Sequence, residues 1–276
     1  MNISDKITFL NQNNIEVMKT IPDNYFDLVI DDPPYGLNAP NMSMGTSKKR
    51  SLKGDGVSVA KRLKGKLNTG DGKLKNRILN KNGFDWDNEI PSEEYFKELF
   101  RISKNQIIFG GNYFPFLWKQ PIRGVGYWNK KQPWENFSQF ELIWTSFDCP
   151  AFEIKISSRG GNNLEEKIHP TQKPISLYKN LLKKFAKSND KILDPHTGSG
   201  SSILACYDFG LNITAIEINE IYYNDSTKRV KNYIKTHESL FDRNSLIILN
   251  NAYDKNSKTA TTVHRTNANQ NNSRLL

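Results

Sequence analysis

Three short apolar runs that each lead into an acidic residue place the strongest constraint on how this chain can fold. The runs cover residues 28–30, 192–193 and 213–216, and the acids that follow are Asp31-Asp32, Asp194 and Glu217. The first is continuously apolar, which is typical of a parallel strand buried on both faces, whereas Thr214 interrupts the third. Segments with helical spacing of apolar residues lie between them. The alternation predicts an α/β fold with a doubly wound, Rossmann-like sheet that binds ligands at the carboxyl ends of its strands.

The rest of the pattern divides the chain into one folded domain, two inserted regions and a tail. We expect a single domain over residues 1–254 and a disordered polar tail over residues 255–276. A basic loop (38–83) and a second region (120–168) are inserted into the domain, and the aromatic-rich stretch 112–168 is expected to form strands and loops. The expected strands cover 7–10, 28–30, 106–109, 191–194, 213–217 and 245–249, and the expected helices cover 15–21, 92–103, 174–185, 201–209 and 220–235.

The basic loop points to a polyanionic partner. Residues 38–83 contain 12 Lys or Arg and only 2 acidic residues, in a chain whose net charge is +10. An excess of this size favours contact with nucleic acid; a disordered insertion or a merely soluble basic surface is the alternative. The expected contacts are with phosphates for Lys48, Lys49, Arg50, Lys61, Arg62, Lys64 and Lys66, and with base edges for Lys155, Arg159 and Asn162.

Several classes of protein are disfavoured by the sequence. The 2 cysteines, Cys149 and Cys206, lie far apart and lack metal-ligand spacing, so each is expected to be a small buried thiol. The 4 histidines form no metal-binding grouping, so no metal is expected. The chain has no run of 18 apolar residues and no signal peptide, which predicts a soluble cytoplasmic protein without a membrane partner.

The segment after residue 193 has the pattern of a loop that binds a nucleoside. Asp194 ends a strand, and Gly198-Ser199-Gly200 precedes a helix, where glycines let the backbone approach a ligand closely. Glu217 ends the next strand, and an acid there can accept hydrogen bonds from both ribose hydroxyls; a solvated strand-end acid is the alternative. Ile203 stands in place of the third glycine of the dinucleotide pattern, which favours a cofactor without phosphates.

The segment Asp32-Pro33-Pro34-Tyr35 has the composition of a site that activates the exocyclic amine of a base. The lone pair of such an amine is delocalised into the ring, so the amine is a poor nucleophile. The Asp32 carboxylate and the carbonyl of Pro33, held rigidly by two prolines, can each accept an N–H and free the lone pair. Tyr35 offers a face for stacking on a base that has left the duplex. Asp31 is the weaker candidate because it lies one residue too early.

This order of motifs resembles the S-adenosylmethionine-dependent DNA methyltransferases that methylate an exocyclic amine. It is similar to the subgroup in which the catalytic motif comes first and the cofactor motif last, a circularly permuted order. The matching segments are DPPY (32–35), FGGN (109–112), 126–147, HPTQKP (169–174), ILDPHTGSGS (192–201) and AIEIN (215–219), and they span most of residues 5–230. The resemblance makes the region 120–168 the target-recognition region.

The resemblance also implies a role for each matching residue. Asp32, Pro33, Pro34 and Tyr35 would be catalytic. S-adenosyl-L-methionine would be bound by Asn13, Thr171, Lys173, Pro174, Asp194, Thr197, Gly198, Ser199, Gly200, Glu217, Ile218 and Asn219. Two positions depart from the family: Gln12-Asn13 replaces a Gly-Asp pair, and His196 replaces a Phe in the cofactor loop. We interpret His196 as a substitution beside the cofactor and not as a base.

The aspartate at the head of the tetrapeptide favours N6 of adenine in double-stranded DNA as the target. Cytosine N4, RNA, or a DNA-binding relative that has lost catalysis are the alternatives. The resemblance implies a bacterial or phage-encoded protein, and it leaves open a homodimer and a companion restriction endonuclease. The recognition sequence cannot be read from the residues.

Overall fold

The computed structural model describes residues 2–37, 87–132, 138–158 and 166–237. The basic loop, the expected strand at 245–249 and the expected tail lie outside these residues. Residues 1–230 form one compact unit. A second unit begins at residue 231, and its described part, 231–237, is helical.

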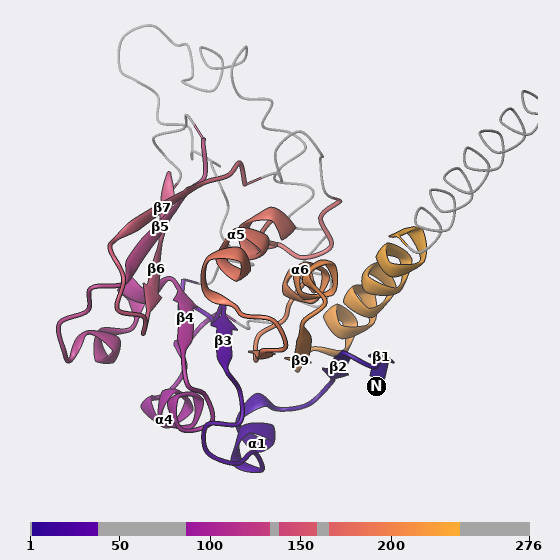
Figure 1. The fold of residues 1–276 in the computed structure, drawn as a ribbon, viewed down its shortest axis with the longest axis horizontal. Helices are drawn as coiled ribbons and strands as arrows, with labels where there is room; N and C mark the ends of the chain where they lie inside the picture. Colours follow the sequence, from indigo (N-terminus) through magenta and orange to yellow (C-terminus); the bar gives the residue numbers. More distant parts are fainter. Residues whose placement is uncertain (1, 38–86, 133–137, 159–165, 238–276) are drawn as a thin grey trace, which may run out of the picture. The chain divides into compact units, whose positions relative to one another are not determined.

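A mixed sheet organises the first unit (Figure 1). Its nine strands lie in the order β1-β2-β9-β8-β3-β4-β6-β5-β7. Their bounds are β1 (Asn2–Ser4), β2 (Ile7–Leu10), β3 (Leu28–Asp31), β4 (Gln106–Phe109), β5 (Val125–Asn129), β6 (Phe140–Thr145), β7 (Phe152–Lys155), β8 (Lys191–Asp194) and β9 (Asn212–Ile216). The neighbours from β2 to β4 pair in parallel, whereas β1 pairs with β2 and β6 pairs with β4 and β5 in antiparallel fashion. The predicted doubly wound sheet is confirmed.

The sheet has a topological switch between β8 and β3. From β8 the chain crosses outward to β9, and from β3 it crosses outward in the opposite direction to β4. Ligands of open α/β sheets bind in the crevice outside the carboxyl ends of the strands at such a point. Asp194 is the last residue of β8 and Asp31 is the last residue of β3. The acidic strand ends singled out in the sequence therefore meet at this crevice.

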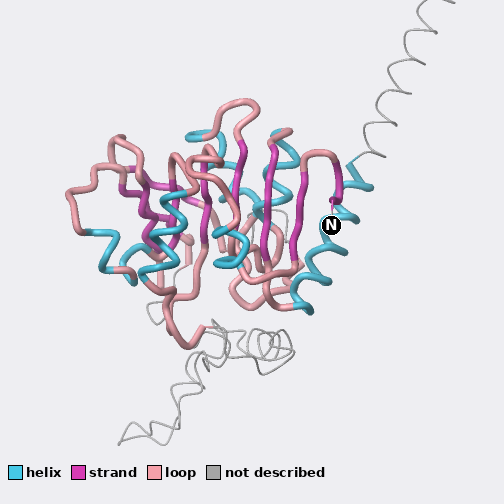
Figure 2. Tube along the Cα trace, turned by 90° about the horizontal axis from the view of Figure 1, so that it is seen from below, coloured by secondary structure: helices cyan, strands magenta, loops and turns pink. Residues whose placement is uncertain are grey.

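Helices cover both faces of the sheet (Figures 1 and 2). The helices α1 (Asn14–Lys19) and α4 (Glu93–Arg101) lie on one side, and α5 (Ile175–Phe185) and α6 (Ser201–Phe209) lie on the other. Alternate residues of each strand point to opposite faces of the sheet. Val29 and Ile108 pack in the hydrophobic cluster that also contains the buried residues of α1 and α4. Phe109 packs its ring against Tyr178 of α5. Every strand between β9 and β4 is therefore buried on both sides.

The helix ends follow the capping signals of the sequence. Ser92 caps α4 by accepting a hydrogen bond from the Tyr95 amide at 3.2 Å. Gly210 ends α6 at φ +63°, a left-handed conformation that favours glycine. A further helix runs from residue 220 to the end of the described part at residue 237.

Three features differ from the expected elements. The short edge strand β1 had no sequence signal. The stretch expected to hold only strands and loops begins with two 3-10 helices, η1 (Gly111–Tyr113) and η2 (Pro115–Trp118), because Pro115 suits the first position of a helix. Cys206 is buried as expected, whereas Cys149 is only half-buried.

Candidate active site

The catalytic segment is shaped by a carboxylate that the sequence analysis did not single out. Asp87 is buried, and its Oδ1 accepts hydrogen bonds from the backbone N–H of Tyr35 (2.6 Å) and of Gly36 (3.0 Å). Gly36 has φ +70°. These two bonds fold the chain directly after the prolines and hold Asp32 and Pro34 at the wall of a pocket. Asp87 lies 52 residues from Tyr35, so the contact has no local signature.

The Asp32 carboxylate is held through one of its two oxygens. Its Oδ1 accepts a hydrogen bond from the Tyr35 hydroxyl at 2.7 Å and forms an ion pair with the Lys173 ammonium. No hydrogen bond to its Oδ2 is present within the described residues, and the shortest contact of Lys173 is with Oδ1. Because Asp32 lines the pocket, Oδ2 is the acceptor that this side chain offers to a ligand.

A second buried carboxylate, Glu141 of β6, completes the group around Asp32. Its Oε1 lies 2.7 Å from the Tyr35 hydroxyl, whose one proton is shared between the two carboxylates, and it pairs with Lys173 Nζ at 2.9 Å. Its Oε2 pairs with Lys130 Nζ at 3.0 Å. The side chains of Lys173 and Glu141 are only 5% and 11% exposed. We call Asp32, Tyr35, Lys130, Glu141 and Lys173 the charge cluster.

Burial and mutual attraction act against one another in the charge cluster. Burial raises the pKa of Asp32, and Glu141 adds to this rise while Lys173 opposes it. For Glu141, burial is outweighed by Lys173 and Lys130, which hold its pKa at about 2. For Lys173, burial is outweighed by the two carboxylates, which raise its pKa. Lys173 is therefore charged, and the ionisation of Asp32 depends on which neighbours it has.

The other end of the pocket is built from the loop between β8 and α6. Gly198 and Gly200 have φ values of +52° and +77°, so this turn requires residues without a Cβ. The backbone N–H of Gly198 donates to Glu217 Oε2 at 2.9 Å, and the N–H of Asn219 donates to Oε1 at 2.8 Å. The Glu217 carboxylate is thus fixed by two backbone donors, although burial raises its pKa.

A layer of buried polar side chains lies between the two ends. His196 Nδ1 lies 2.8 Å from Asp31 Oδ1, and its Nε2 lies 2.9 Å from Asn14 Nδ2. Asp31 is fully buried, and its Oδ2 accepts from the Tyr95 hydroxyl at 2.8 Å. Burial works against charge on His196, but Asp31 outweighs it and raises the pKa of the imidazole. These contacts commit Asp31 to supporting the site.

Asp194 also supports the site, through hydrogen bonds to the cofactor loop and to α6. Its carboxylate accepts from the Ser202 hydroxyl and from the N–H of His196. Burial raises the pKa of Asp194 to about 7. Asp194 therefore ties the end of β8 to both the loop and the first turn of α6.

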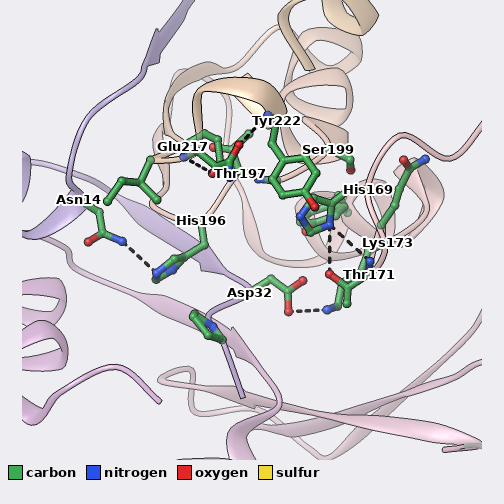
Figure 3. Close-up of a pocket in the computed structure, with 16 residues that line it drawn as sticks. Asn14, Asp32, His169, Thr171, Lys173, His196, Thr197, Ser199, Glu217 and Tyr222 are labelled. Carbon is green, nitrogen blue, oxygen red and sulfur yellow. Dashed lines mark hydrogen bonds and ion pairs between the residues drawn. The ribbon is translucent and has the colours of Figure 1, made fainter. Parts of the chain in front are cut away.

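The pocket between the two ends has a volume of about 240 Å³. Figure 3 shows Asp32 at one end, near Thr171 and Lys173, and Glu217 at the other, near Thr197. Ten of the residues singled out in the sequence line it: Asp32, Pro34, Thr171, Lys173, Thr197, Gly198, Ser199, Glu217, Ile218 and Asn219. Segments that are far apart in the sequence therefore form one site.

Six other residues of the expected site lie around the pocket but do not line it. They are Asn13, Pro33, Tyr35, Pro174, Asp194 and Gly200. The Asn13 side chain caps α1 by accepting from the amides of Ile15 and Glu16, and its neighbour Asn14 lines the pocket instead. The Tyr35 ring stacks on Tyr113 with a centroid distance of 4.8 Å, so one of its faces is covered.

The pocket also contains residues to which the sequence analysis gave no role. His169 is buried, and its pKa is lowered to about 3 by burial and by Lys173, so the ring is neutral. Tyr178 of α5 is 5% exposed, and its hydroxyl forms no hydrogen bond within the described residues. The remaining ones are Asn14, Gln172 and Tyr222; His196, which was expected beside the cofactor, also lines the pocket. His169 and Gln172 belong to the HPTQKP segment, whose pattern was the only signal available.

The expected DNA contacts fall almost entirely outside the described residues. This holds for Lys48, Lys49, Arg50, Lys61, Arg62, Lys64, Lys66, Arg159 and Asn162. Lys155, the exception, is exposed on β7 and pairs with Glu153 at 2.8 Å. The described residues contain no group of three His, Cys, Asp or Glu that could hold a metal ion. They also contain no helix long and apolar enough to span a membrane.

Comparison with known proteins gives matches over most of the chain. Residues 110–229 match a family model described as DNA methylase. The Type II methyltransferase M.HpaI of Haemophilus parainfluenzae is 22% identical over 84% of this chain and 76% of its own length. The Type II methyltransferase M.HinfI of Haemophilus influenzae is 24% identical over 83% of this chain and 70% of its own length.

The fold recurs in a solved structure of similar size. The PvuII DNA methyltransferase, described as cytosine-N4-specific, has a TM-score of 0.50 and 11% identity, and the match covers 81% of this chain and 86% of that one. At this identity the likeness concerns the fold. The range matched by the family model contains the HPTQKP segment, the cofactor loop and Glu217.

Proposed function

Because this chain belongs to the DNA methylase family that its motifs resemble, we infer that it transfers a methyl group from S-adenosyl-L-methionine to an exocyclic amine of DNA. The target we propose is N6 of adenine in a double-stranded, short recognition sequence. The observation that carries the proposal is a single pocket with the free Asp32 oxygen at one end and the fixed Glu217 carboxylate at the other.

The pocket residues fit the proposed cofactor. Each Glu217 oxygen accepts one backbone N–H and keeps lone-pair capacity for a ribose hydroxyl. Ile218, 61% exposed at the pocket, offers an apolar surface to an adenine ring. The acidic side chains of Asp32 and Glu217 favour a cationic ligand. When bound, the cofactor supplies an electrophilic methyl group on a positively charged sulfur.

Asp32 is the residue that acts on the target amine in this proposal. Its Oδ2 accepts one N–H, which directs the nitrogen lone pair away from the base ring and toward the methyl group. The Pro33 carbonyl is the proposed acceptor for the second N–H. Methylation makes the nitrogen more acidic, and Asp32 is the adjacent acceptor through which the released proton reaches solvent. Because this geometry excludes a base within the duplex, the target nucleotide must be flipped out.

The remaining parts of the proposal concern regions that are only partly described. We assign target recognition to residues 120–168, of which β5, β6 and β7 form the described core, and phosphate contacts to the basic loop. The single domain over residues 1–254, the circularly permuted relation to other methyltransferases, a homodimer and a companion restriction endonuclease stay predictions. Stacking of Tyr35 on a flipped base also stays a prediction, because Tyr113 stacks on its ring and Tyr35 does not line the pocket.

The direct test is transfer of labelled methyl from S-adenosyl-L-methionine to mixed-sequence duplex DNA, followed by digestion to nucleosides. N6-methyladenine as the labelled product is the expected result. N4-methylcytosine would keep the mechanism and overturn the base assignment. If the protein binds the cofactor and labels RNA instead, the substrate assignment is wrong; if it binds no cofactor, the non-catalytic alternative replaces the proposal.

A further inference from the structure

We propose that Glu141 is a positioning residue of this site: it draws Lys173 toward itself, so that Lys173 holds only one oxygen of Asp32 and leaves the other for the amine. The inference rests on the proposed methyl transfer and extends it to a side chain outside the pocket. Glu141 does not line the pocket, so it acts through Lys173 and Tyr35.

The sheet explains why Glu141 reaches Asp32. Strand β6 pairs with β4 in antiparallel fashion, with Ile143 opposite Phe109. Strand β4 pairs in parallel with β3, whose carboxyl end leads into Asp32. Glu141 therefore extends from the β6 end that lies beyond the carboxyl ends of β3 and β4. Glu141 and Tyr35 are 106 residues apart in the sequence, and the pairing of β6 with β4 and of β4 with β3 brings them together.

The charges of the cluster make Glu141 necessary for a free Asp32 oxygen. An ammonium has three donors; Lys173 Nζ donates to the Tyr35 hydroxyl at 3.3 Å and forms ion pairs with Asp32 Oδ1 and Glu141 Oε1. Without the second carboxylate, the buried ammonium would have Asp32 as its only anionic partner. It would then engage both Asp32 oxygens, because a buried charge is costly unless it is paired. The amine would have to compete with Lys173 for its own acceptor.

The Tyr35 hydroxyl gives the same arrangement a second function. It has one proton and lies 2.7 Å from an oxygen of each carboxylate. When an amine donates to Asp32, the Tyr35 proton can turn toward Glu141 without leaving a buried hydroxyl unpaired. Glu141 thus lets Asp32 accept the substrate while every other polar atom of the charge cluster keeps a partner.

The neighbours of Asp32 set the expected pH dependence. They are Lys173 and Tyr178 from the α5 side, Glu141 from β6 with Lys130 behind it, and Tyr35 from its own segment. Glu141 carries a like charge, so its removal lowers the pKa of Asp32. Lys130 offsets Glu141, so removal of Lys130 leaves Glu141 freer to attract Lys173 and raises the pKa of Asp32. The two substitutions therefore have opposite signs on one carboxylate.

The test compares Glu141→Gln with Lys130→Gln in single-turnover methyl transfer over a pH range. Glu141→Gln should lower the plateau rate by about ten- to a hundredfold. It should also move the acid limb of the profile to lower pH, with cofactor affinity unchanged within about threefold. Lys130→Gln should move the acid limb to higher pH with a smaller loss of rate. A structural defect would reduce the rate without shifts of opposite sign.

Glu98→Gln is the matched control. It removes one carboxylate from an ion pair of similar length, Arg101 to Glu98 at 2.7 Å, on α4 away from the pocket. Its pH profile should equal that of the wild type. If wild type methylates DNA and Glu141→Gln keeps its rate and acid limb, the inference is wrong while the proposed function stands. If Glu141→Gln fails to fold, an unshifted acid limb in Lys130→Gln overturns the inference. If wild type transfers no methyl group, the proposed function itself has failed.

Discussion

The two ends of the pocket hold their carboxylates in different ways. Glu217 is fixed by the backbone N–H groups of Gly198 and Asn219, which never change charge. Asp32 is fixed by the ionisable side chains of Tyr35 and Lys173, and Lys173 is held in turn by Glu141. The first end is therefore determined by backbone geometry. The second is determined by a balance of charges, which a single substitution or a change of pH can shift.

Removal of Lys173 should have the largest effect on the rate of methyl transfer, because Lys173 belongs to the end of the pocket that depends on charges. Lys173→Gln leaves two buried carboxylates facing one another, and loss of one partner of a buried ion pair costs about 3–5 kcal/mol. We expect the single-turnover rate to fall by about two hundredfold or more. Because Lys173 lowers the pKa of Asp32, the acid limb of the rate profile should move to higher pH.

Lys173→Gln can also show that Lys173 does not belong to the Asp32 end of the pocket. The family resemblance assigns Lys173 to the carboxylate of the cofactor's methionine group. If that is its main role, isothermal titration will show a large loss of cofactor affinity and the acid limb will not move. Lys173 would then belong to the cofactor end, and Asp32 would be held by Tyr35 alone.

Removal of Glu217 tests the backbone-built end. Glu217→Ala deletes the acceptor of two backbone N–H groups, and cofactor affinity should fall by about thirtyfold to a hundredfold. The transfer rate at saturating cofactor should change by less than about threefold, because Asp32 keeps its neighbours. Glu220→Ala, an exposed carboxylate three residues later, is the control and should leave binding unchanged. A large loss of rate at saturation would mean that the two ends are not separable.

Substitution in the buried polar layer of Asp31, Tyr95 and His196 should mainly change the stability of the fold. His196→Phe restores the residue usual in the family's cofactor loop but leaves Asp31 with only the Tyr95 hydroxyl. We expect the free energy of unfolding to fall by about 1–3 kcal/mol. The His196 pKa is raised on folding, so its contribution is fully present below the unfolded pKa and is lost as pH rises through the folded pKa.

Denaturant unfolding of the two proteins at several pH values measures this difference. The difference in the free energy of unfolding between wild type and His196→Phe should be largest at acid pH and should decrease toward alkaline pH. A difference that increases with pH would contradict the ion pair with Asp31. Cofactor affinity should change by less than about threefold, because the backbone donors to Glu217 are untouched.

The smallest expected effect comes from the pocket hydroxyl of Tyr178. Tyr178→Phe keeps the ring contact with Phe109 and removes a hydroxyl that has no partner within the described residues. If the hydroxyl contacts the bound cofactor, the affinity should fall by about threefold to tenfold. Tyr223→Phe is the matched control. The hydroxyl of Tyr223 lies 3.4 Å from the Phe9 carbonyl, and Tyr223 does not line the pocket. Equal affinities in both variants would exclude this contact.

The contrast between the two ends also explains what the sequence could predict. The cofactor end depends on local features: glycines at left-handed positions and an acid at a strand end leave a readable pattern. The position of Asp32 and Asp194 at the carboxyl ends of two strands, beside one crevice, followed from the alternation of strands and helices. At this end the structure adds mainly Asn14 and the supporting role of Asp194.

The catalytic end depends on contacts between distant segments, which leave no local pattern. The position of Asp32 at a strand end could be predicted, but Glu141 reaches it only through the antiparallel pairing of β6 with β4. Asp87 reaches the Tyr35 amide across a stretch of chain with no regular pattern. The sequence also assigned Lys173 a role at the cofactor, whereas in the structure its ammonium lies on Asp32 and Glu141.

We propose that Asp32 acts in methyl transfer and not in holding the cofactor. The most direct measurement determines, for wild type and Asp32→Ala, both the dissociation constant of S-adenosyl-L-methionine and the single-turnover yield of labelled nucleoside from duplex DNA. For Asp32→Ala we expect a dissociation constant of the cofactor within about threefold of that of wild type. We expect no labelled N6-methyladenine from this variant. Labelled product at a rate near that of wild type, or loss of cofactor binding together with loss of product, would contradict the proposal.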